Sequence, residues 1–94
     1  MGAFIMKAVI SVTGRDSMGI IAKVSCACAE YGANIIDISQ TVLSEYFAMI
    51  MIVDITKMNI PFGDFVDAMT DLGKKQNLEI HTMHEDIFNS MHTI

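Results

Sequence analysis

The stretch from Val12 to Asn34 constrains the fold more than any other part of this chain. Its residue pattern is typical of a strand end, a turn, a helix and the start of a second strand. Gly14 and Gly19 stand at the two ends of the turn and enclose the polar residues 15–17. Because glycine permits positive φ and close backbone approach, the turn can be tight and can leave N–H groups pointing outward.

The helix that follows this turn makes the stretch a candidate site for binding an anion. The first N–H groups of a helix have no partner within the helix, and they lie at the positive end of its dipole. Such an end is a ready site for a carboxylate or a phosphate. The alternative is an ordinary turn in which Asp16 or Ser17 caps the helix.

Composition favours one small domain that associates with itself. The chain has 94 residues, of which 52% are hydrophobic and 18% are charged, and its mean hydropathy is +0.44. No apolar run approaches the roughly 18–20 residues that span a bilayer, so we expect no membrane contact. The excess of apolar residues then predicts burial against a second copy.

The net charge argues against nucleic acid as a partner, and the two cysteines indicate the compartment. The net charge of -5 and the pI near 4.8 would repel phosphate backbones, so nucleic-acid binding is not expected. Cys26 and Cys28 would lie on different faces of one helix, so a bond between them would distort the helix, and we interpret both as small buried hydrophobes of a cytoplasmic protein.

The apolar periodicities along the chain predict six main elements and a tail. We expect a flexible leader over residues 1–5 and a single domain over residues 6–94. The expected order is a strand at 7–13, a helix at 18–31, strands at 35–42 and 46–55, a helix after Pro61, a strand at 78–84 and a short helical tail at 85–94. This βαββαβ order predicts an α+β, ferredoxin-like fold, with a four-stranded antiparallel sheet and two helices on one face.

Two strands carry further information. Residues 46–55, YFAMIMIVDI, form an almost unbroken apolar run, which predicts a strand that is covered on both faces, by a partner or by the tail. Residues 35–42 alternate between apolar and polar positions, which predicts one wet face.

The run TGRDSMGIIAKVSCACAEYGANIIDIS, followed by YFAMIMIVDI, resembles an ACT domain, and the whole length from Met6 is similar to stand-alone, single-ACT prokaryotic proteins. The family's hallmark is an Asp-x-x-Gly turn before the first helix, which is Asp16-Ser17-Met18-Gly19 here. An Asn-Ile pair enters the second strand, and Asn34-Ile35 matches it.

This resemblance implies a non-catalytic regulatory module that binds an amino acid or a similar small carboxylate where two domains meet in a homodimer, and that signals to a protein partner. In the serine-sensing members, two turn positions and the asparagine contact the ligand. Asp16 and Asn34 match two of these, and Gly14 stands where a longer polar residue is usual. The expected ligand-binding residues are Gly14, Arg15, Asp16, Ser17, Met18, Gly19, Ile20, Asn34 and Ile35. We expect no cofactor, no metal and no catalytic residue.

The chemistry of such a site can be stated from the residues. A free amino acid carries a carboxylate and an ammonium group. Amides near residues 18–20 would receive the carboxylate, Asp16 could accept from the ammonium group, and Asn34 could bind either. Arg15 could pair with Asp16 or with an acid of a partner.

Three other classes are open alternatives. Arg15 and Asn34 are superficially similar to the catalytic pair of acylphosphatases, but the glycine-rich phosphate-binding segment of that family is missing. A metal-binding protein would need Cys26 and Cys28, or a cluster of histidines with nearby acids, at His81, His84, His92, Glu85 and Asp86. A pure protein-interaction module would use the nine methionines as an adaptable contact surface.

Overall fold

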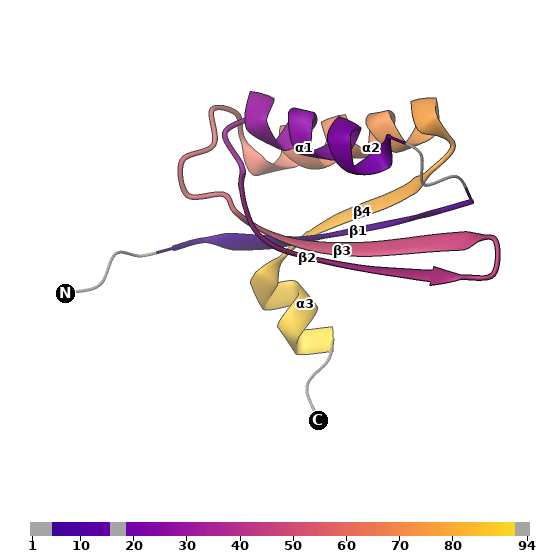
Figure 1. The fold of residues 1–94 in the computed structure, drawn as a ribbon. Helices are drawn as coiled ribbons and strands as arrows, with labels where there is room; N and C mark the ends of the chain where they lie inside the picture. Colours follow the sequence, from indigo (N-terminus) through magenta and orange to yellow (C-terminus); the bar gives the residue numbers. More distant parts are fainter. Residues whose placement is uncertain (1–4, 16–18, 92–94) are drawn as a thin grey trace.

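The computed structural model describes residues 5–15 and 19–91, and these form four strands and three helices (Figure 1). The elements are β1 (Lys7–Gly14), α1 (Ile20–Glu30), β2 (Asn34–Leu43), β3 (Tyr46–Asp54), α2 (Phe62–Gln76), β4 (Glu79–His84) and α3 (Glu85–Met91). The βαββαβ order and the helical tail predicted from the sequence are confirmed.

The four strands form one sheet in the order β2-β3-β1-β4, and every neighbouring pair is antiparallel. Helices α1 and α2 lie together on one face of the sheet, and α3 lies on the other side (Figure 1). This is the ferredoxin-like arrangement expected from the sequence. β2 and β4 are the two edges, so β2 has one neighbour only.

The core lies between the sheet and the two long helices. Alternate residues of β1 and β3 point to this layer because side chains of a strand alternate between its faces. The fully buried large side chains are Ile10, Val12, Val24, Cys28, Met49, Met51, Val53, Phe65 and Met69. Tyr31 at the end of α1 meets Phe65 of α2 edge to face, with ring centroids 6.1 Å apart.

The second face of the sheet is covered only in part. α3 packs on β1 and β4, and Val9 is 4% exposed on this face. On β3, however, Ile50 is 46% exposed. The tail therefore covers the part of this face that β1 and β4 form, and it does not supply the second cover that the apolar run of β3 predicted.

β2 does not have the one wet face that its alternation predicted. Nine of its ten residues are exposed, and Ile38 alone is half-buried. Val42 and Leu43 are 67% and 68% exposed. A bulge between Ile35 and Asp37 interrupts the pairing with β3. The reason is position: an edge strand lies at the margin of the helical layer, so its apolar side chains are not covered.

The start of α1 differs from the prediction. The helix begins at Ile20 rather than Met18, and Gly19 occupies the N-cap position with φ 73° and no side-chain cap. Asp16 and Ser17, the residues expected to cap this helix, lie outside the part of the chain that the structure describes, so their side-chain contacts stay a prediction.

Gly32 ends α1, as a glycine directly after an apolar helical pattern predicts. Gly32 has φ 78°, its N–H donates to the Ala29 carbonyl, and the Ala33 N–H donates to the Cys28 carbonyl. These two bonds make a Schellman motif. The Lys57 carbonyl oxygen would lie 3.0 Å from a Cβ at Gly32, so a larger residue would be crowded there.

Two residues of α1 that were expected to be buried are exposed. Ile21, which its helical spacing from Ile20 and Val24 predicts to lie on the buried stripe, is 37% exposed. Cys26 is exposed whereas Cys28 is buried. The helix buries a narrow stripe of Ile20, Val24 and Cys28, because it packs on the sheet along one line and α2 covers only one of its flanks.

Candidate functional site

The predicted ligand site begins where β1 ends. Gly14 is the last residue of β1, Arg15 follows it, and Gly19 precedes α1. Asp16, Ser17 and Met18 lie outside the described residues, so their predicted contacts are untested. The structure thus describes the two ends of the predicted turn.

Gly14 is a glycine because another side chain fills its space. A Cβ at this position would lie 2.5 Å from Cδ2 of Leu78, the residue that precedes β4. Leu78 is 7% exposed and belongs to the core. The longer polar residue that serine-sensing ACT domains usually carry here would displace Leu78. The sequence alone did not reveal this contact, because the two residues are far apart along the chain.

Among the described residues, Arg15 contacts the β2–β3 hairpin, and its expected partner Asp16 lies outside them. Its guanidinium lies 3.4 Å from Oε2 of Glu45 and 5.6 Å from the ring centroid of Tyr46. The ion pair is exposed, with 72% of the Arg15 side chain and 59% of the Glu45 side chain accessible, so it contributes little stability. The cation–π contact orients the guanidinium at the hairpin tip.

Gly19 precedes α1 and has free space on one side. Apart from its chain neighbours, no heavy atom of the described residues lies within 4 Å of the place where a Cβ of Gly19 would be. Ile20 is 3% exposed, so its side chain belongs to the core and only its backbone N–H can serve a ligand. A ligand at this end would therefore accept hydrogen bonds from the backbone N–H groups of the first helical turn.

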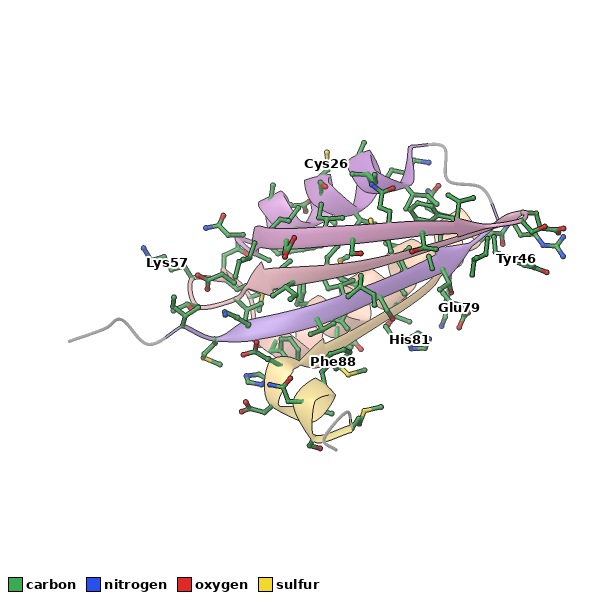
Figure 2. The ribbon with its side chains drawn as sticks, turned by 60° about the horizontal axis from the view of Figure 1, so that its bottom comes forward. Cys26, Tyr46, Lys57, Glu79, His81 and Phe88 are labelled. Carbon is green, nitrogen blue, oxygen red and sulfur yellow. The ribbon has the colours of Figure 1, made fainter. Side chains whose placement is uncertain are left out.

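Asn34 and Ile35, the other predicted site residues, lie at the opposite end of the sheet. Gly14 is paired with Phe47 of β3, and Asn34 is paired with Asp54 of the same strand. At about 3.4 Å per residue, this register separates the two sites by about 24 Å along β3. Figure 2 shows this length: Tyr46 lies at one tip of the sheet and Lys57 lies near the other. One chain does not bring the predicted residues together.

The neighbour of Asn34 is a well-held carboxylate. The Thr56 side chain and the Thr56 backbone N–H bond to Asp54 and hold its pKa below the usual value, with a further contribution from Lys57 and Lys7. The Thr56 hydroxyl oxygen also accepts from the Met6 N–H at 2.9 Å. Asp54 is therefore a fixed negative charge beside Asn34.

A hollow lies at the Gly14 end of the sheet. It has a volume of about 1030 Å³, and it is lined by residues 13–15, residues 46–48, the end of α2 and residues 76–79. It shares Gly14 and Arg15 with the predicted site. Its other walls were not predicted, because they come from three segments that only the fold brings together.

The residues of the metal-binding alternative are dispersed. His81 lies 3.5 Å from Glu79 on one face of β4, and the ring of His84 packs edge-on against Phe62 on the other face. Glu79 and His81 are labelled side by side in Figure 2. His92 lies outside the described residues. Among residues 5–15 and 19–91, no three His, Cys, Asp or Glu side chains gather where they could hold a metal ion.

The two cysteines differ in environment. Cys28 is buried, and its burial raises the pKa of the thiol to about 11. Cys26 is exposed on the outer side of α1.

Across the described ranges, no helix has the length and apolar character needed to cross a bilayer.

Comparison with known proteins places this geometry in a family. The family model of the ACT domain matches residues 7–82, which include every strand except the end of β4. A UPF0237 protein of Clostridium acetobutylicum is 45% identical over 89 residues, which are 95% of this chain and 100% of the relative. A UPF0237 protein of Listeria innocua is 40% identical with the same coverage.

A solved structure shows the same fold. The ACT domain protein from Streptococcus pneumoniae superimposes with a TM-score of 0.78 at 42% identity, over 88% of this chain and 93% of that one. Together with the matched family model, this likeness identifies the chain as a member of the ACT domain family.

Proposed function

We propose that this protein is a non-catalytic regulatory module that binds an amino acid or a similar small carboxylate between two copies of itself. The observation that carries the proposal is the separation of Gly14 and Asn34 to opposite ends of one sheet, beside an exposed edge strand. If these residues share a ligand, the ligand must lie where one copy meets another.

β2 is suited to pair with a second β2. It is an edge strand of 10 residues with unpaired backbone groups, and it has no Pro or Lys to block pairing. Exposed apolar side chains stand at both of its ends, Ile35 and Ile36 at the start and Val42 and Leu43 at the finish. The residues between them include the polar Ser39, Gln40 and Thr41.

Antiparallel pairing about a two-fold axis sets the start of one β2 against the finish of the other. With the axis near Ser39, Ile36 faces Val42 of the second copy and Ile35 faces its Leu43. Apolar cross-strand pairs of this kind are favourable. An axis at Asp37 would instead oppose two like charges. The apolar ends thus favour one register.

This register brings the two halves of the predicted site together. Asn34 of one copy comes beside Ser44 of the other, at the end of the sheet where Gly14, Arg15 and the amino end of α1 lie. The carboxylate of a zwitterion would take backbone N–H donors at α1, and its ammonium group would take Asp16. Asn34 of the second copy would bind either group.

A dimerisation module without a ligand is the second candidate, since the same exposed edge supports it. Ligand binding separates the two candidates. A ligand at a hundred times its Kd stabilises the native state by about 2.7 kcal/mol. For a domain of this size, the melting temperature would then rise by about 11–22 °C.

The experiment is a thermal-shift screen of the proteinogenic amino acids, with sedimentation velocity on the same samples. We expect a dimer and a rise in melting temperature with at least one amino acid. Asn34→Ala and Asp16→Ala should each abolish that rise, and Asp71→Ala, at an exposed position of α2, should not. A dimer with no response to any amino acid favours the second candidate. A monomer at high concentration contradicts both.

A further inference from the structure

We propose that the hollow beside Gly14 is a second small-molecule site, which binds a carboxylate on an apolar or aromatic body. Arg15 and Lys74 would receive the carboxylate. The hollow shares Gly14 and Arg15 with the predicted ligand site, but its lining does not include Asn34 or any other residue of β2. Variants at Lys74 therefore test the hollow without changing the strand proposed to pair in the dimer.

The walls of the hollow suit an apolar body. Phe47 and Leu78, which are 3% and 7% exposed, belong to the core and form apolar lining. Tyr46, which is 53% exposed, adds an aromatic ring at the rim. The volume of about 1030 Å³ is at the upper end of ligand pockets, which are mostly apolar with a few polar groups.

The polar groups of the hollow are mainly donors. The whole chain has six Lys and Arg residues and a net charge of -5, yet Arg15 and Lys74 both line this one hollow. The Oε1 atom of Gln76 accepts from Lys23, so the amide N–H groups are what this side chain can offer to a ligand. Glu79 is the acid of the lining, and it lies 3.5 Å from His81.

Arg15 can bind a second carboxylate without losing its first. Its guanidinium has five N–H donors, and the contact with Glu45 is a single one at 3.4 Å. The Tyr46 ring, 5.6 Å away, holds the guanidinium at the rim. An oriented guanidinium loses less conformational entropy when it binds a planar carboxylate.

The wall that carries Lys74 is also fixed. The N–H groups of Asn77 and Leu78 both donate to the Gly73 carbonyl, which ends α2, and Asn77 has φ 58°. A Cβ at Gly73 would lie 2.7 Å from the Leu78 carbonyl oxygen, so helix and strand are in close contact there. Lys74 therefore extends from a rigid helix end.

The experiment uses 3-phenylpropionate as the probe and its neutral analogue 3-phenylpropanol as the matched control. The chain has two tyrosines and no tryptophan. In a Tyr31→Phe background, Tyr46 is the fluorophore, and its emission reports on the rim. We expect saturable quenching by the acid and at least fivefold weaker binding of the alcohol. Backbone amide shifts in ¹H–¹⁵N spectra should centre on residues 13–15 and 73–79.

Two neighbouring lysines give a charge-matched pair of variants. Lys74→Met removes a lining cation, whereas Lys75→Met removes the same charge from a residue outside the lining. Loss of one charge-assisted hydrogen bond predicts about tenfold weaker binding for Lys74→Met. For Lys75→Met we expect a change within twofold.

Three results would overturn the proposal. They are amide shifts confined to other residues at 10 mM probe, equal binding of the acid and the alcohol, and equal weakening by the two lysine variants. The last result would mean that the acid responds to overall charge and not to this hollow.

Discussion

Single residues in this protein are explained by neighbours that the linear sequence does not show. Gly14 is small because Leu78 occupies its side-chain space. Gly19 has open surroundings among the described residues, but its φ of 73° favours glycine. The two glycines that enclose the turn are thus required for different physical reasons, Gly14 for lack of space and Gly19 for its backbone conformation. The sequence pattern predicted the turn, but it could not separate these reasons.

The two cysteines should differ in reactivity. Cys28 is buried with a pKa of about 11, so almost none of it is thiolate at neutral pH, whereas Cys26 is exposed. In a titration with a disulfide reagent such as Ellman's reagent at pH 7.5, we expect one reactive thiol in the native protein and two in guanidinium. Cys26→Ser should leave no rapidly reacting thiol. Rapid reaction of Cys28 in that variant would contradict its burial.

Asp54 should make stability depend on pH in acid. Its pKa is lower in the native state than in the unfolded chain, so its stabilisation is complete above the unfolded value and is lost as the pH falls through the native value. We expect Asp54→Asn to melt below the wild type at pH 7, and the difference between the two melting temperatures to shrink as the pH falls below the ordinary aspartate pKa of 3.8. The control is Asp71→Asn, on the exposed side of α2. A constant difference between Asp54→Asn and the wild type at all pH values would contradict this account.

At the scale of elements, β2 is where sequence and structure differ most. Its alternation predicted a strand with one dry face, and the structure exposes nine of its ten residues. Periodicity reports which side chains favour burial, but it does not report whether the strand lies at the centre or the edge of the sheet. The apolar residues of β2 are consistent with a dry face that only a second copy would cover.

Pairing through β2 can be tested with one charge. Val42 is 67% exposed in the single chain, so Val42→Lys should change the fold of the monomer little. In a dimer paired through β2, the lysine would lie among apolar side chains, and we expect at least tenfold weaker association in sedimentation equilibrium. Thr70→Lys, at an exposed position of α2, is the control. Equal association of both variants and the wild type would exclude this edge as the interface.

At the scale of the whole molecule, the sequence predicted the fold well and the site only in parts. The βαββαβ order follows from periodicities that are local, and the described elements agree with them within about two residues at their ends. Of the predicted helical tail, the structure describes residues 85–91, and these are helical. The positions of Gly14 and Asn34 depend on strand register, which is a property of the assembled sheet. The hollow beside Gly14 depends on three distant segments, so no local pattern could predict it.

The central claim, that each ligand lies between two copies, is tested most directly with mixed dimers. The proposed dimer has two ligand sites, and each site combines the turn of one copy, with Asp16, and Asn34 of the other copy. In a mixed dimer of Asp16→Ala with Asn34→Ala, one site therefore carries both substitutions and the other site carries neither. We measure the amino acid from the thermal-shift screen, by titration calorimetry, on each variant alone and on the purified mixed dimer. The account predicts no binding to either variant alone and one ligand per mixed dimer. A mixed dimer that binds no ligand, as expected if each copy held its own complete site, would contradict it.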